Sequence, residues 1–212
     1  MQKRILCFGD SNTWGAVPAE GTRHPDDVRW TGILQRELGD GYKVIEEGHN
    51  GRTSVHDDMI ENRLSGVKYF APCLDSQSPL DLVIIMLGTN DMKARFGVDA
   101  RTIAYGFGRY MDALRITPMA GKKPEVLLVS PILIDKSYKE VPLLHDMFRE
   151  DAVERSEKLA EAYKEFADGE GIYFMDAAQY GKASVRDGVH MEAEYHEKLG
   201  LAFAAKVKEI LG

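Results

Sequence analysis

Apolar runs of strand length recur along this chain, with helix-like segments between them. These runs lie at residues 5–8, 42–45, 82–87, 126–129 and 172–175. Several are hydrophobic throughout instead of alternating with polar residues, which is typical of strands that helices cover on both faces. The alternation of strand and helix predicts an α/β fold in three layers, a doubly wound sheet of about five parallel strands with helices on both faces.

Four amphipathic segments are expected to supply covering helices. The first begins at an Asp26 cap and ends at Gly39, with an inner face of Trp30, Ile33, Leu34 and Leu38. The second places Ile103, Phe107, Met111 and Leu114 on one side, and the third covers about 146–168. The last carries Tyr195, Leu199, Ala202, Phe203, Val207 and Ile210. Without repeats or obvious linkers, residues 1–212 are expected to form a single domain.

Composition and charge exclude several function classes. The net charge is −7 and no cluster of Lys or Arg occurs, which argues against a nucleic-acid surface. No apolar stretch approaches the roughly 20 residues of a membrane span, and the first strand begins too early for a signal peptide. Cys7 and Cys73 are expected to be small buried hydrophobes in a reducing cytoplasm. The expected partner is a small molecule or another copy of the chain.

Four short polar motifs stand out from this background. They are Gly9-Asp10-Ser11, Gly48-His49-Asn50-Gly51, Gly88-Thr89-Asn90-Asp91 and Asp187-Gly188-Val189-His190. The first three each follow an apolar run, so they should lie at the rim where open α/β sheets bind ligands. Each motif alone is more simply a turn or a helix cap. Their combination and order favour a shared site.

The residue types in these motifs are those of a serine hydrolase. A serine hydroxyl becomes a nucleophile when an imidazole removes its proton, and a carboxylate orients that imidazole. Asp187 and His190 are three residues apart, so one tight turn at Gly188 brings the carboxylate to the ring. The predicted catalytic residues are therefore Ser11, His190 and Asp187.

Hydrogen-bond donors for an oxyanion are predicted from three of the motifs. The Ser11 N–H lies at an expected helix start, where N–H groups lack partners. At Gly51 the backbone can approach a reacting carbonyl closely, and Asn90 brings an amide NH2 to the next strand end. Asp10, Trp14 and Asn50 are predicted to contact the substrate. No cofactor and no metal are expected.

Together, these blocks resemble the SGNH, or GDSL, hydrolase family over nearly the whole chain. The sequence is similar to its short-chain arylesterase/acyltransferase branch through residues 4–11, 28–32, 44–48 and 80–91. The resemblance implies a flavodoxin-like fold, Ser11 as nucleophile with Asp187 and His190 completing the triad, and Ser11, Gly51 and Asn90 as the oxyanion hole. It also implies that loop 131–148 shapes the acyl pocket and that the chain forms homo-oligomers.

The expected activity is that of a serine esterase acting on acetyl or other short-chain esters through an acyl-enzyme, with acyl transfer to alcohols as a further outcome. Within this class, acetylated sugars or xylo-oligosaccharides and acyl thioesters are alternative substrates. Outside it, a metal-dependent hydrolase could use His56, Asp57 and Asp58, or the acidic and His residues at 190–196. A non-catalytic ligand-binding domain is the last alternative. Lys93, Arg95 and loop 132–145 are the candidates for specificity.

Overall fold

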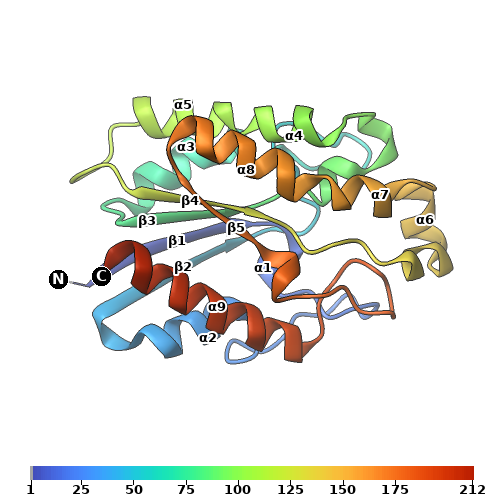
Figure 1. The fold of residues 1–212 in the computed structure, drawn as a ribbon, viewed down its shortest axis with the longest axis horizontal. Coiled ribbons are helices and arrows are strands. Elements are labelled where there is room, and N and C mark those ends of the chain that lie inside the picture. The colour runs from blue at the N-terminus through green and yellow to red at the C-terminus, as the bar shows by residue number, and fades with distance from the viewer. Residues whose placement is uncertain (1) are drawn as a thin grey trace.

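The computed structural model describes residues 2–212 and confirms an α/β fold on a five-stranded parallel sheet (Figure 1). The strands are β1 (Lys3–Gly9), β2 (Tyr42–Gly48), β3 (Leu82–Met86), β4 (Glu125–Ser130) and β5 (Tyr173–Asp176). They lie in the order β2-β1-β3-β4-β5, and each neighbouring pair is parallel. The direction of winding changes at β1 and β3, and ligands bind beyond the carboxyl ends of strands at such a point.

Helices cover both faces of the sheet, which gives the predicted three layers (Figure 1). One face carries α2 (Trp30–Leu38) and α9 (Ala193–Leu211). The other carries α3 (Gly66–Gln77), α4 (Ala100–Gly106), α5 (Gly108–Ile116) and α8 (Leu159–Glu170). The short helices α1 (Ser11–Trp14), α6 (Pro142–Phe148) and α7 (Ala152–Glu157) lie toward the carboxyl ends of the strands.

Neighbouring residues of each strand enter different cores, because successive side chains point to opposite faces. In β1, Leu6 and Phe8 belong to the core beneath α3, α5 and α8, whereas Ile5 and Cys7 pack toward α2 and α9. All four of these side chains are buried. The wholly apolar strand runs follow from this covering on both faces.

Two expectations about helix boundaries are wrong. Asp26 does not cap α2, which begins at Trp30 with Arg29 at the N-cap position. The Asp26 carboxylate instead forms an ion pair with Arg29. The single helix expected at about 146–168 is broken into α6, α7 and α8. Arg149 ends α6 with φ of 60° and ψ of −156°, a backbone conformation that a continuous helix does not allow.

The other two expected helices are present, and α3 was not expected at all. Ile103, Phe107, Met111 and Leu114 are buried along α4 and α5 and the residue that joins them. Helix α3 contains Pro72, which cannot donate the intrahelical hydrogen bond and weakens the helical pattern.

Among residues 2–212, no helix is long and apolar enough to cross a membrane.

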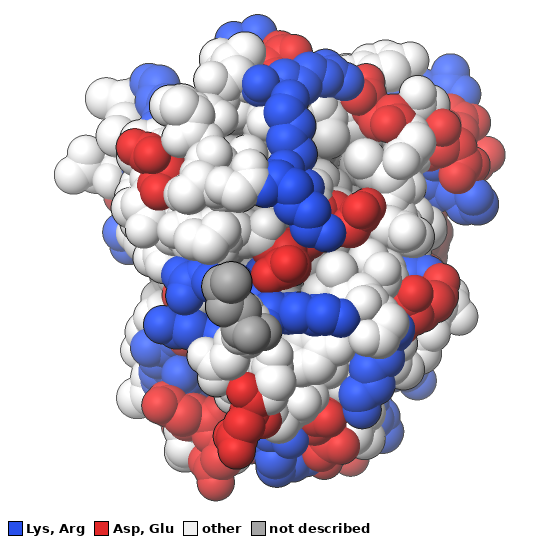
Figure 2. All heavy atoms as spheres, turned by 90° about the vertical axis from the view of Figure 1, so that its left-hand side faces the viewer, with Lys and Arg blue, Asp and Glu red and all other residues white. Residues whose placement is uncertain are grey.

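The face at the amino ends of the strands is far from the ends where the polar motifs lie. Figure 2 shows acidic and basic side chains mixed over this face, without a large area of one sign. The polar motifs lie at the other end of the sheet, near α1 and α6 (Figure 1).

Candidate active site

Ser11 is held at the carboxyl end of β1 by the short helix α1. It is the first residue of α1, and the carboxylate of Asp10 caps this helix by accepting a hydrogen bond from the Asn12 N–H at 3.0 Å. Gly15 ends α1 in the left-handed conformation, with φ of 86°. A turn this tight leaves the Ser11 side chain at the rim of the sheet.

Gly51 and Asn90 follow the two strands that flank β1. Gly51 lies in the loop after β2 with φ of 76°, a conformation that favours glycine. Asn90 opens a short turn of 3-10 helix, Asn90–Met92, beyond β3. One hydrogen of its amide is donated to the Arg52 carbonyl oxygen at 3.1 Å, which fixes the orientation of the amide.

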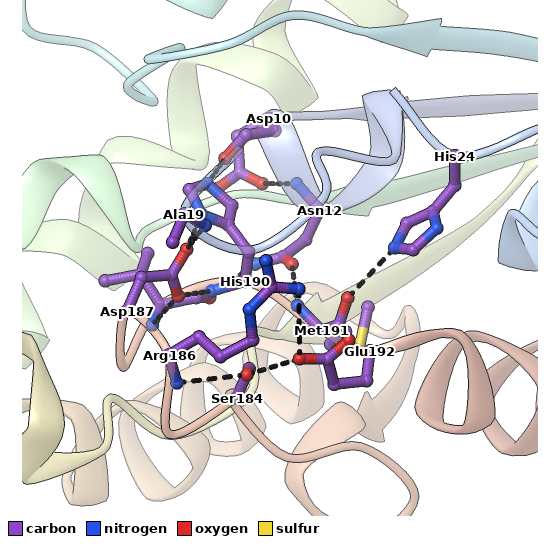
Figure 3. Close-up of polar contacts among 12 residues, drawn as sticks. Asp10, Asn12, Ala19, His24, Ser184, Arg186, Asp187, His190, Met191 and Glu192 are labelled. Carbon is purple, nitrogen blue, oxygen red and sulfur yellow. Dashed lines mark hydrogen bonds and ion pairs between the residues drawn. The ribbon is translucent and has the colours of Figure 1, made fainter. Parts of the chain in front are cut away.

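Asp187 and His190 lie in the loop before α9. The predicted turn is present: Oδ1 of Asp187 accepts hydrogen bonds from the N–H groups of Val189 and His190, both at 2.9 Å. Oδ2 lies 2.8 Å from His190 Nδ1 and accepts the Ala19 N–H at 2.9 Å (Figure 3). Gly188 has φ of 73°, and a Cβ there would lie 2.4 Å from the Tyr138 nitrogen. The turn therefore needs glycine.

The structure joins these segments at one contact. Nε2 of His190 lies 3.0 Å from Oγ of Ser11, and Nδ1 of the same ring faces Asp187. The imidazole thus lies between a hydroxyl and a carboxylate, each within hydrogen-bond distance. Ser11 and Asp187 are both buried.

Burial acts to raise the pKa of both carboxyl groups near this contact, but the net shifts are opposite. It would raise the pKa of Asp187, but the hydrogen bond and charge of His190 and the neighbouring N–H donors lower that pKa to about 2. Burial of Asp10 raises its pKa to about 6, although the Asn12 N–H and the charge of His190 act in the opposite direction. Asp187 is therefore ionised at neutral pH.

A cavity of about 310 Å³ opens over Ser11 and His190. Gly51, Asn90 and Asn50 line it, and so does Trp14. Asp10 is not among the lining residues: its side chain is buried beneath α1 as the helix cap. Of the three residues predicted to contact the substrate, the structure brings Trp14 and Asn50 to the cavity and leaves Asp10 behind it.

The walls of this cavity differ in polarity. Val141, Leu144, Met147 and Phe148 form an apolar wall from helix α6 and the residue before it. Glu61 and Lys93 also line the cavity, and the Lys93 ammonium lies 2.6 Å from the Glu61 carboxylate. Segment 131–148 therefore does contribute to the cavity.

Comparison with known proteins gives a consistent result. The model of the GDSL-like lipase/acylhydrolase family matches residues 7–198. The chain belongs to this family.

Solved structures of similar proteins agree over the whole chain. The native aryl esterase of M. smegmatis is 39% identical with a TM-score of 0.93, covering 99% of this chain and 100% of that one. A carbohydrate acetylesterase from Sinorhizobium meliloti is 38% identical with a TM-score of 0.91, at the same coverage. A carbohydrate acetylesterase family member from the same organism is 33% identical, with a TM-score of 0.93 and full coverage of both chains. A comparison with curated protein sequences found no match. Family membership and these relatives make the chain a carboxylic ester hydrolase.

Three residues near the reacting groups of this GDSL-family hydrolase were not found from the sequence. The Ala19 N–H binds Asp187, Glu61 lines the cavity, and Asn12 hydrogen-bonds to both neighbours of His190. Ala19 and Glu61 lie in irregular loops, where no periodicity marks them. Asn12 directly follows Ser11, and this position next to the predicted nucleophile was its one signal in the sequence.

Three of the candidate metal ligands have hydrogen-bond partners in this GDSL-family chain. Glu192 accepts a hydrogen bond from the Ser184 hydroxyl at 2.6 Å, and His196 Nδ1 accepts the Trp30 N–H at 3.3 Å. Asp57 accepts the Ser65 N–H at 3.0 Å. Within residues 2–212, no three His, Cys, Asp or Glu side chains form a group that could hold a metal ion.

Proposed function

We propose that this chain is a cofactor-independent serine esterase for small acyl esters. Ser11 is the nucleophile, His190 the general base and Asp187 the residue that orients it. One observation carries the proposal: His190 lies within hydrogen-bond distance of both the Ser11 hydroxyl and the Asp187 carboxylate, at the base of a cavity. Nucleophile, base and orienting group in that order are the arrangement that serine hydrolases need.

The acylation step uses the geometry as follows. His190 Nε2 takes the proton of the Ser11 hydroxyl while Oγ forms a bond to the ester carbonyl carbon. The carbonyl π electrons move to its oxygen, and the ionised Asp187 stabilises the imidazolium. When the tetrahedral intermediate collapses, His190 gives the proton to the leaving alkoxide and the acyl group stays on Ser11. Water then attacks the carbonyl carbon of this acyl-enzyme while His190 takes one of its protons. When the second tetrahedral intermediate collapses, His190 returns the proton to Ser11 and the acid is released.

Three donors are proposed to stabilise the oxyanion. The Ser11 N–H is at the start of α1 and has no carbonyl partner within the helix. Gly51 and Asn90 line the same cavity. The Asn90 amide donates one of its two hydrogens to the Arg52 carbonyl oxygen, and the other hydrogen is available to the oxyanion. Loss of one such donor typically lowers kcat by about 10²- to 10³-fold. Asn90→Ala is expected to fall in this range.

The size of the cavity supports a short acyl group. A volume of about 310 Å³ is at the lower end of small-molecule sites, which run from roughly 300 to 1,000 Å³. The apolar wall from α6 suits a methyl or short alkyl group. Acetylated carbohydrates form a second candidate substrate class, favoured by the Glu61–Lys93 pair in the cavity lining and by the 38% identical acetylesterase. If the apolar wall excludes water from the acyl-enzyme, an alcohol can accept the acyl group instead.

A Ser11→Ala variant tests the nucleophile. It is expected to lose hydrolysis of p-nitrophenyl acetate, and it should no longer take up one equivalent of a serine-directed phosphonate, measured by intact mass. Ser130→Ala is the matched control, because Ser130 is a buried serine at the end of β4 whose hydroxyl binds Asp176 away from the cavity. Full activity in Ser11→Ala would disprove the assignment.

A substrate panel tests the acyl and alcohol classes. We expect kcat/KM for p-nitrophenyl esters to fall from acetate through butyrate to decanoate. Acetylated xylo-oligosaccharides and acyl thioesters, assayed beside the aryl acetates, separate the alternatives. A decanoate ester hydrolysed faster than the acetate would contradict the short-acyl proposal.

Self-association and a cytoplasmic location stay proposals. The two cysteines, Cys7 and Cys73, are buried and unpaired, which supports a reducing compartment. The homo-oligomer rests on the family resemblance alone. Light scattering coupled to size exclusion measures the mass directly, and a mass of one chain at micromolar concentration would contradict it.

A further inference from the structure

Asn12, the residue after Ser11, is bonded to both neighbours of His190. Its Nδ2 donates to the Val189 carbonyl oxygen at 3.1 Å, and its Oδ1 accepts the Met191 N–H at 3.3 Å (Figure 3). One amide therefore holds the main chain on either side of the imidazole. Val189 and Met191 lie 177 and 179 residues further along the sequence than Asn12.

The main chain of Asn12 is held as firmly as its side chain. Its N–H donates to the Asp10 carboxylate at 3.0 Å, and its carbonyl oxygen accepts the Trp30 indole N–H at 3.1 Å. The residue is 3% exposed. All its polar groups are thus paired, and a side chain anchored in this way fixes what it binds.

The partners demand an amide at this position. Val189 presents a carbonyl oxygen, which needs a donor, and Met191 presents an N–H, which needs an acceptor. Only an amide of this length supplies both from one side chain. A carboxylate keeps the acceptor and turns a second oxygen toward the Val189 carbonyl. A leucine, the fourth residue spelled by the GDSL family name, supplies neither.

We propose that Asn12 is a positioning residue that sets the distance between Ser11 Oγ and His190 Nε2. The proposal rests on the proposed function, in which His190 takes the proton of Ser11. Asp187 and His190 share one loop and keep their geometry by local hydrogen bonds. Ser11 and His190 come from separate segments, and Asn12 joins those segments beside the point of proton transfer.

The test compares Asn12→Leu with the wild type. A shift of about 1 Å between reacting groups lowers rates by about 10²-fold, so kcat for p-nitrophenyl acetate is expected to fall by roughly 10- to 100-fold. KM should change little, since Asn12 does not line the cavity among the described residues. The pH at which activity is half-maximal on the acid side should stay in place, because Asp187 and His190 remain paired. The rate of phosphonate labelling of Ser11 should fall in parallel with kcat.

Ser156→Ala is the matched control for loss of a buried polar side chain. The Ser156 hydroxyl also makes two hydrogen bonds to main chain, to Val153 and Ile134, but neither partner belongs to the loop that carries His190. Its activity is expected to stay close to wild type. If Asn12→Leu loses no more activity than Ser156→Ala, or loses it through KM alone, the proposal is overturned.

A second variant covers the case in which Asn12→Leu does not fold. Asn12→Asp keeps the size of the side chain but replaces the donor with a second, charged oxygen, and a fall in kcat at unchanged KM is expected again. Wild-type kcat in Asn12→Asp would overturn the need for an amide. The Ser11→Ala result separates the two proposals: if that variant stays active, the proposed function fails, whatever the Asn12 variants do.

Discussion

The Nε2 atom of His190 lies 3.0 Å from the Oγ atom of Ser11, although 179 residues separate them in the sequence. Parallel strands explain this distance, because all carboxyl ends meet at one edge of the sheet. Ser11 follows β1, which lies between β2 and β3, and the loop after β5 returns across that edge before α9 begins. The contact depends on the topology as a whole, and the imidazole is oriented by its own loop.

Substituting Asp187→Asn is expected to lower kcat/KM by about 10³- to 10⁴-fold, the size of effect seen when the orienting carboxylate of a triad is lost. The Asp187 oxygens accept three main-chain N–H groups and face His190 Nδ1. An amide can satisfy only part of this set, because its NH2 group must face a donor. Steady-state kinetics with p-nitrophenyl acetate measure the loss.

The stability that Asp187 contributes to the wild type, and that Asp187→Asn lacks, should depend on pH with a defined sign. The folded-state pKa of Asp187 is lowered from 3.8 to about 2, so its ionised form stabilises the fold above about pH 4, and this contribution is lost as the pH falls toward 2. For the loss of activity, Asp99→Asn is the control, since Asp99 caps α4 at a remote site. Activity lost equally in both variants would contradict the role of Asp187.

Asp10→Asn should change the pH dependence of stability in the opposite direction. Burial raises the folded-state pKa of Asp10 from 3.8 to about 6, so its stabilising contribution is full below about pH 4 and is lost as the pH rises through 6. The wild type should therefore lose on the order of 3 kcal/mol relative to the variant between pH 4 and 7. Asn is as good an N-cap as Asp, so α1 keeps its start. Urea denaturation at pH 4, 5, 6 and 7 measures this difference, and parallel curves for the two proteins would contradict it.

The strands and the polar motifs were predictable because their signals are local. Strands such as β3 are buried on both faces, so their apolar runs are unbroken in the sequence. Ser11, Gly51 and Asn90 follow three strands directly, and parallel pairing then brings them together. Asp187 and His190 needed only a tight turn between them.

The remaining features depend on contacts between distant segments. Arg149 ends α6 at a positive φ that its residue type does not favour, and the sequence therefore suggests a longer helix. The α2 start at Trp30 is set by His196, which accepts the Trp30 N–H from another helix. Asn12 resembles any polar residue at a helix start until its partners at 189 and 191 are known.

Lys93→Met should destabilise the protein through the charge it leaves behind. Lys93 and Arg95 neutralise Asp58 and Glu61; the Lys93 ammonium lies 2.6 Å from Glu61 and 3.5 Å from Asp58. Asp58 is fully buried. Removing one partner of a buried ion pair costs about 3–5 kcal/mol, because an uncompensated charge remains. Denaturant unfolding measures the loss.

A double variant and a surface control make this prediction specific. Lys93→Met with Glu61→Gln leaves one acid and one base, Asp58 and Arg95, and is expected to recover at least half of the lost stability. Lys206→Met breaks a surface pair with Glu209 and should change the free energy of unfolding by less than about 0.5 kcal/mol. A double variant no more stable than Lys93→Met would show that charge balance is not the cause.

Gly48→Ala tests how closely β2 holds helix α1, which carries Ser11. A Cβ at Gly48 would lie 2.1 Å from the Trp14 nitrogen and 2.5 Å from its Cα, both main-chain atoms of α1. Gly48 is paired with Gly9 in the sheet, so α1 must move and carry Ser11 with it. We expect a loss of about 1–3 kcal/mol in stability. A fall of at least about tenfold in kcat/KM is also expected from the displacement of Ser11.

The control is Gly169→Ala in α8. The added Cβ meets no atom within 4 Å there, and the substitution should stabilise the helix by about 0.5–1 kcal/mol. If Gly48→Ala kept wild-type stability and kcat/KM, the close contact between β2 and α1 would not be what fixes the position of Ser11.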